Sequence, residues 1–215
     1  MRENEGWYYS RELTGAKKQV IVRDCKKYAT GHEVVNFGCH MYEAYSYSYV
    51  EISVLIGLLI ASGSVDFIVT GCSSGQGMML ACNSMPGVLC GYAPTPKDAY
   101  LFAQINYGNV ISLPLGEEYT WSGVANFEAT IEKLFSEPFG QGYPKSEAVR
   151  KQKDTKELKE IRALSQINTV DLIKRMDREV INMIMQKEDV VSFVLNNGRD
   201  PEISDWIRSF IDNGY

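Results

Sequence analysis

The sequence predicts an α/β fold with a central parallel sheet, followed by a C-terminal helical extension. Three observations support this prediction. Short apolar segments alternate with helical patterns as far as Pro114, and repeated βα units of this kind form right-handed parallel sheets. The segment 65–70 (VDFIVT) is apolar nearly throughout, as expected of a strand covered on both faces. From Lys145 onward, only helical patterns occur.

The elements of the α/β part follow from these patterns. Apolar segments predict strands at 32–37, 65–70, 88–92 and 110–113. Helical patterns occupy 11–28, 49–62, 78–84 and 96–106. Gly31 and Gly63 follow two of these helices, and glycine ends a helix readily because it adopts the left-handed conformation at little cost. A tyrosine-rich loop at 38–47 and a glycine- and serine-rich turn at 71–77 complete this part.

The chain changes character after Pro114. A helix is expected at 127–135, and the glycine- and proline-containing segment 139–144 interrupts the pattern. Further helices are expected at 146–165, 169–185 and 203–211. The first of them is densely charged, as in a helix that is solvated on most of its surface. We therefore predict an α/β domain over 1–143 and a helical extension over 144–215.

Composition narrows the function. The 215 residues are 45% hydrophobic and carry a net charge of −5, which is typical of a globular chain and unfavourable for sequence-independent binding of nucleic acid. The longest apolar run, 50–61, has about 12 residues and contains Glu51, whereas a bilayer span needs about 20. The N-terminus has no apolar signal-like stretch. We therefore expect a cytoplasmic protein with no nucleic-acid or membrane partner.

Cysteine and histidine usage argues against a metal centre. The five cysteines form an odd set without a Cys-x-x-Cys pair, which indicates reduced thiols in a cytosolic protein and not disulfides or a zinc site. The only histidines are His32 and His40, too few for a histidine-rich metal site.

The turn after the predicted strand 65–70 is the most informative feature. Ligands bind at the carboxyl ends of parallel strands, and a Gly/Ser turn that leads into a helix presents N–H groups to anions. The sequence GCSSGQGMM is neither a dinucleotide-binding nor a nucleoside-triphosphate motif. Cys72 lies in this turn, where the positive end of a helix stabilises a thiolate that acts as base or nucleophile. The alternative is a small buried residue that fills space.

Several motifs resemble the ribose-5-phosphate isomerase B / galactose-6-phosphate isomerase family. These are CSSGQGM at 72–78, CNSMPG at 82–87, Ile105-Asn106, Asn109-Val110 and the strand-like GHEVVNFG at 31–38. The resemblance covers about 30–142, and the GQG turn and helical tail are similar to a longer subgroup. It implies a Rossmann-like three-layer sandwich, aldose–ketose isomerisation of a sugar phosphate through a cis-enediolate, and no metal or organic cofactor.

The resemblance also implies roles for the turn. Cys72 matches the cysteine that serves as the base in many members. Other members use a glutamate at the position of Met78, and methionine cannot act as a base. The N–H groups of the turn would stabilise the enediolate as an oxyanion hole does, and this set comprises Ser73, Gly75, Gln76 and Gly77. Ser74 stands where the family has a threonine and would pass a proton to or from the substrate oxygens.

The remaining candidates bind the substrate. Asn106 matches an asparagine that binds sugar hydroxyls, and Tyr49 matches an aromatic residue that lines the pocket. Glu3 and Asn4 stand for the Asp-His pair that follows the family's first strand. Lys145 and Arg150 are the candidates for the phosphate, which arginine holds through a planar two-point fork. The alternative for these two is a pair of solvated residues in a charged helix.

The sequence departs from the family at two further points. The ring-opening histidine is replaced by Ile105, so either His40 substitutes for it or the substrate has no ring, as with a tetrose phosphate. No apolar strand opens the chain, so the first strand is expected to be truncated or replaced by 7–9.

Neighbouring subunits complete the site in this family, which implies a homodimer or homotetramer. Two other functions remain open: a sensor that binds sugar phosphates without catalysis, and an enzyme that uses Cys72 as a covalent nucleophile.

Overall fold

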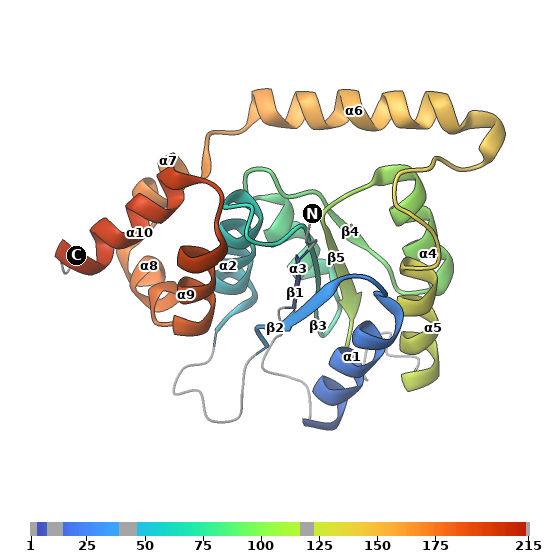
Figure 1. Cartoon of the computed structure of the whole chain (residues 1–215), viewed down its shortest axis with the longest axis horizontal. Coiled ribbons are helices and arrows are strands. Elements are labelled where there is room, and N and C mark those ends of the chain that lie inside the picture. The colour runs from blue at the N-terminus through green and yellow to red at the C-terminus, as the bar shows by residue number, and fades with distance from the viewer. Residues whose placement is uncertain (1–3, 8–14, 39–46, 117–122, 214–215) are drawn as a thin grey trace.

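The computed structural model describes residues 4–7, 15–38, 47–116 and 123–213 (Figure 1). Its centre is a sheet of five parallel strands in the order β2-β1-β3-β5-β4. In chain order the strands are β1 (Asn4–Trp7), β2 (Glu33–Asn36), β3 (Phe67–Cys72), β4 (Cys90–Tyr92) and β5 (Val110–Pro114). The predicted α/β fold with a parallel sheet is therefore confirmed.

The first strand is present as a short segment of four residues, Asn4–Trp7, where the sequence predicted a strand that is truncated or replaced by 7–9. β1 lies between β2 and β3, with Glu5 opposite Val34 on one side and Phe67 on the other. Its sequence, NEGW, has no apolar pattern. Main-chain hydrogen bonds to two neighbouring strands hold it, and these bonds do not depend on side-chain type.

Helices cover both faces of the sheet. The pattern is clearest in β3, where Phe67 and Val69 face one apolar cluster and Ile68 faces the other, because successive side chains of a strand point to opposite faces. The first cluster includes α1 (Gly15–Tyr28), α4 (Pro96–Leu101) and α5 (Val124–Leu134). The second includes α2 (Tyr49–Ala61) and α3 (Gln76–Asn83). Every element predicted in this part is present, and α4 continues into a π-helical turn, η1 (Phe102–Asn106).

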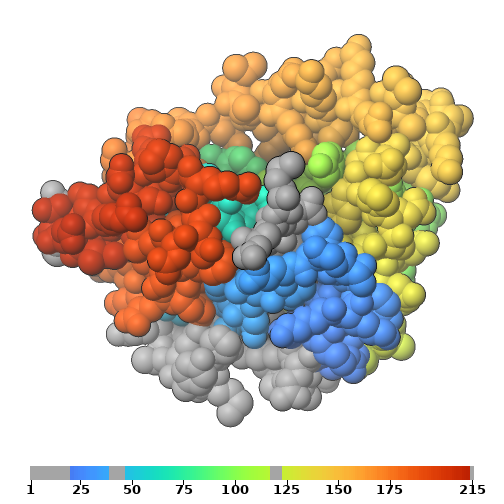
Figure 2. Space-filling model, in the orientation of Figure 1, coloured from blue at the N-terminus to red at the C-terminus, as the bar shows by residue number. Residues whose placement is uncertain are grey.

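The C-terminal helices return to the α2 side of the sheet. After a short 3₁₀ turn, η2 (Lys145–Glu147), helix α6 (Ala148–Ser165) crosses over the end of the sheet where the chain begins. Four helices follow: α7 (Thr169–Arg175), α8 (Arg178–Met185), α9 (Glu188–Asn197) and α10 (Pro201–Asn213). They share one apolar cluster with α2, and Figure 2 shows orange-to-red atoms of this part of the chain gathered on one side of the molecule. The predicted helical extension is present, whereas the boundary at residue 143 stays a prediction.

Two details of this region differ from the sequence prediction. The single helix expected over 169–185 is interrupted at Met176 and Asp177, where the Asp177 carboxylate accepts a hydrogen bond from the Glu179 N–H and starts α8. Helix α9 was not predicted. Its first turn carries Glu188 and Asp189, which is a typical signal for the start of a helix because acidic side chains stabilise its positive end.

Candidate active site

The turn after β3 is tightly built around one glycine. Cys72 ends β3 and is partly buried, and Gly75 precedes α3 in the left-handed conformation, with φ of 74°. A Cβ atom on Gly75 would lie 2.6 Å from Cε2 of Tyr92 and 2.9 Å from the main-chain carbon of Leu113. Only glycine therefore fits here without a shift of its neighbours.

The neighbouring strand β5 and the two residues that follow it hold this turn by three hydrogen bonds. The N–H of Leu115 donates to the Cys72 carbonyl at 3.0 Å, and the N–H of Gly116 donates to the Ser73 carbonyl at 2.9 Å. The hydroxyl of Ser112 donates to the Gly75 carbonyl at 2.6 Å. The carbonyl groups of Cys72, Ser73 and Gly75 thus face β5 or the chain that continues from it.

This arrangement turns main-chain donors outward. Because a trans peptide is planar, the N–H that follows each carbonyl points in the opposite direction, so those of Ser73, Ser74 and Gln76 point away from β5. The Gln76 N–H meets the Ser74 hydroxyl oxygen at 3.3 Å. Within the described residues, the N–H groups of Ser73 and Ser74 make no hydrogen bond. Together with the positive end of α3, they form a site suited to an anion.

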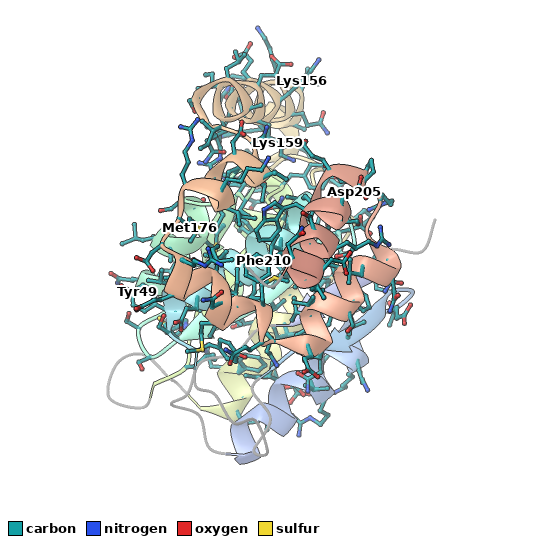
Figure 3. All side chains as sticks on the ribbon, turned by 90° about the vertical axis from the view of Figure 1, so that its left-hand side faces the viewer. Tyr49, Lys156, Lys159, Met176, Asp205 and Phe210 are labelled. Carbon is teal, nitrogen blue, oxygen red and sulfur yellow. The ribbon has the colours of Figure 1, made fainter. Side chains whose placement is uncertain are left out.

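The thiol of Cys72 lies beside Gly77, which is partly exposed. A Cβ atom on Gly77 would be 3.9 Å from Sγ of Cys72 and 3.8 Å from Cε2 of Tyr49. The thiol and the tyrosine ring therefore flank the same glycine. Tyr49 starts α2, which Ser48 caps, and it is 48% exposed at the surface (Figure 3). The structure thus brings Cys72, the turn 73–77 and Tyr49 together, whereas their roles stay predictions.

Asn106 lies at the opposite end of the sheet. It ends η1 and is exposed, and the nearby carbonyl of Asn109 accepts a hydrogen bond from the N–H of Ile68, at the start of β3. Cys72 is four residues further along β3, which corresponds to about 13 Å. Asn4 starts β1 and pairs with Glu33, so it also lies at the amino end of the strands. One chain does not bring either residue to the Cys72 turn.

The two phosphate candidates belong to the same opposite end. The segment before them is anchored beside η1, since the N–H groups of Gly140 and Gly142 donate to carbonyls of residues 103 and 104. Lys145 and Arg150 are both exposed. The guanidinium of Arg150 already pairs with Glu147 at 2.7 Å and Asp154 at 2.8 Å. These carboxylates raise the pKa of Arg150, and the phosphate role stays a prediction.

Other sequence candidates are only partly covered by the structure. Glu3 and His40 lie outside the described residues. Ile105 offers no titratable group, and its carbonyl accepts a hydrogen bond from the Thr155 hydroxyl at 2.6 Å. Of the cysteines, four are described and all are free thiols: Cys25, Cys72, Cys82 and Cys90.

Sequence reasoning missed the residues of β4 and β5 that contact the turn, among them Tyr92 and Ser112. Both lie on strands beside the turn rather than in it. A polar Ser112 between apolar residues of VISLP was the available signal. No sequence signal pointed to Tyr92, because the contact of its ring with Gly75 depends on how β4 and β5 align.

The described ranges contain neither a metal-binding cluster of histidine, cysteine and acidic side chains nor a helix able to cross a membrane.

Comparison with known proteins identifies the family. The family model for ribose/galactose isomerases matches residues 12–151, which is more than half of the chain. The chain belongs to the ribose/galactose isomerase family. It is accordingly a sugar isomerase with a Rossmann-like fold. A search of curated proteins gives no match.

Solved structures extend this similarity to the C-terminal helices. A 4-deoxy-L-threo-5-hexosulose-uronate ketol-isomerase complexed with a tartrate is 33% identical, with a TM-score of 0.89, and the alignment covers 97% of this chain and 99% of that one. A ribose-5-phosphate isomerase from Vibrio parahaemolyticus is 30% identical over the same shares, with a TM-score of 0.86. A type B ribose 5-phosphate isomerase from Trypanosoma cruzi, 22% identical, covers 77% of this chain and 100% of that one, and its TM-score of 0.63 reflects a shared fold.

Proposed function

We propose that this sugar isomerase interconverts an aldose and a ketose, with Cys72 as the base. The observation that carries the proposal is the position of the Cys72 thiol beside the outward N–H groups of Ser73 and Ser74 and the positive end of α3. A base and an anion-stabilising group in one small site are the two parts that proton transfer next to a carbonyl requires.

The reaction balances within the substrate. The Cys72 thiolate removes the proton from the carbon beside the carbonyl, and the carbonyl oxygen becomes an enediolate oxygen. The N–H groups of the turn stabilise that negative charge as it forms. The thiol then returns the proton to the neighbouring carbon, while a hydroxyl proton moves between the two substrate oxygens. Ser74 is the proposed carrier of this second proton, since its hydroxyl lies in the same turn.

A phosphorylated sugar of four to six carbons is the first candidate substrate. Family membership and the similarity to a protein described as a ribose-5-phosphate isomerase support it. Ile105 carries no group that could open a sugar ring, which favours open-chain substrates. Lys145 and Arg150 are proposed to meet the phosphate, and Tyr49 to line the pocket.

A sugar acid is the second candidate substrate. Arg150 is already paired with two carboxylates, which argues against its binding a doubly charged phosphate group. The similar protein named as a ketol-isomerase of a hexosulose uronate also favours a carboxylate. Both candidates are anions, so the N–H groups of the turn suit either.

We further propose that two copies of the chain build each site. The Cys72 turn and the set that includes Asn106 lie at opposite ends of the sheet, so one chain holds two separate half-sites. A homodimer, or a homotetramer of such dimers, would join the half-sites of different copies. The free thiols support a cytoplasmic location.

Turnover and subunit sharing can be tested with the same variants. Ribose 5-phosphate and 4-deoxy-L-threo-5-hexosulose uronate are offered in deuterated water, and deuterium incorporation reports proton transfer. Cys72→Ala should lower turnover by at least about 100-fold, whereas Cys25→Ala, at a buried thiol on α1, should not. Mixing inactive Cys72→Ala with inactive Asn106→Ala should restore activity if the sites are shared.

Three results would contradict the proposal. Binding without turnover in the parent chain would favour a sensor. A covalent mass adduct on Cys72 would favour nucleophilic catalysis. Failure of the mixed variants to regain activity would show that each chain works alone.

A further inference from the structure

Strand β5 carries one polar side chain in an apolar sequence, VISLP. This residue, Ser112, is completely buried. A buried hydroxyl destabilises the fold unless it makes a hydrogen bond. Its partner is the carbonyl of Gly75, at 2.6 Å, which belongs to the turn after β3 and is 37 residues away in sequence. The serine therefore links the middle of β5 to the functional turn.

The Gly75 carbonyl accepts a second hydrogen bond besides that from Ser112. It accepts the hydrogen bond from the Met79 N–H at 3.1 Å, which starts the hydrogen-bonding ladder of α3. Because the peptide is planar, the direction of this carbonyl also fixes the direction of the Gln76 N–H on its other side. Ser112 and the Met79 N–H thus together hold the orientation of the first peptide of α3, and Ser112 is the one of the two that ties it to the sheet. It does so without reaching the surface, since its side chain is buried beneath the turn.

Steric contacts alone do not fix the orientation of the Gly75 carbonyl, because they restrict movement of Gly75 in only one direction. Tyr92 and the main chain of β5 prevent Gly75 from moving toward them, but they do not prevent movement away. The N–H groups of Leu115 and Gly116 hold residues 72 and 73. Beyond residue 73, the described contacts from β5 to the turn carbonyls consist of the Ser112 hydroxyl alone.

We propose that Ser112 is a positioning residue for the isomerisation. It fixes the peptide between Gly75 and Gln76, so that the positive end of α3 and the Ser74 hydroxyl, which accepts a hydrogen bond from the Gln76 N–H, are in place before the enediolate forms. Pre-aimed donors stabilise the developing charge without reorganisation. This inference rests on the proposed function of the Cys72 turn. It adds a buried residue that acts through the main chain of the turn.

The test compares Ser112→Ala with Ser62→Ala. Ser62 is an equally buried serine whose hydroxyl donates within the end of α2, roughly 20 Å along that helix from Tyr49. Each protein is assayed with ribose 5-phosphate and with 4-deoxy-L-threo-5-hexosulose uronate. A third measurement is the affinity for the hydroxamate of the matching sugar acid, a planar imitation of the enediolate.

For Ser112→Ala we expect kcat to fall by about 10- to 100-fold, with KM changed by less than about twofold, because the donors act on the transition state. Hydroxamate affinity should fall by the same factor as kcat. Ser112→Cys keeps a weak donor of similar size, so its loss should be intermediate. Ser62→Ala should match the parent in all three measurements.

Two outcomes overturn the inference while leaving the proposed function intact. One is an active parent that Ser112→Ala matches in kcat. The other is a Ser112→Ala loss that follows only the fraction of unfolded protein, with unchanged hydroxamate affinity per folded molecule. If the parent converts neither substrate, the proposed function itself fails and the inference falls with it.

Discussion

The substitution Gly75→Ala tests the architecture of the turn most directly. Gly75 has φ of 74°, a left-handed conformation that costs an alanine at least about 1 kcal/mol relative to glycine. The added Cβ would also lie 2.6 Å from the Tyr92 ring and 2.9 Å from main-chain atoms of Leu113 and Pro114. The ring can rotate, but the strand cannot move freely, so overpacking adds about 1–3 kcal/mol. The expected total is about 2–4 kcal/mol of lost stability.

Gly87→Ala provides the matched control. Gly87 has nearly the same backbone conformation, with φ of 72°, but its Cβ would meet no atom within 4 Å. The two variants therefore share the conformational cost of about 1 kcal/mol, and their difference isolates the steric cost at the turn. A domain stabilised by about 5–15 kcal/mol remains folded after either change.

Urea denaturation and steady-state kinetics measure the two effects. Gly75→Ala should lose about 1–3 kcal/mol more than Gly87→Ala. It should also lower kcat by at least about 100-fold, because the N–H groups of the turn must shift. Equal stability losses in the two variants would refute the steric reasoning. Full turnover by folded Gly75→Ala would refute the role of the turn.

Three further predictions concern other parts of the molecule. The Glu128 carboxylate accepts a hydrogen bond from Lys27, which lowers the pKa of Glu128. The parent protein should therefore be more stable than Glu128→Gln above about pH 5, and this difference should disappear as the pH falls through the lowered pKa. Urea titrations of both proteins across this pH range check it. Ile184→Ala should cost about 2–5 kcal/mol in a single transition, because this buried residue of α8 shares a cluster with α2; two separate transitions by circular dichroism and tryptophan fluorescence would contradict this. Tyr49→Ala should raise KM more than it lowers kcat, since the ring borders the thiol from an exposed position; an unchanged KM would remove Tyr49 from the pocket.

Local sequence patterns were sufficient to predict most strands of the sheet and the helices that cover it. The segment 65–70 predicted a covered strand, and β3 is that strand shifted by two residues. The strand β1 could not be predicted, because NEGW has no apolar pattern and its place depends on main-chain bonds to β2 and β3. Helix 169–185 was predicted as one element because the apolar pattern continues through the break that Asp177 makes.

For the candidate site, the sequence by itself determined the turn that carries Cys72, since a strand, a glycine- and serine-rich segment and a helix are contiguous there. Only the tertiary structure decided what surrounds this turn. Parallel register sets Ser112 opposite Thr70 of β3 and Tyr92 opposite Ser112 on the far side of β5, and no local pattern encodes that alignment. The crossover helix α4 runs back along the sheet before β5 begins, which carries Asn106 to the end opposite Cys72. The physical reason is that contacts between distant segments follow from strand order, whereas motifs describe only neighbours along the chain.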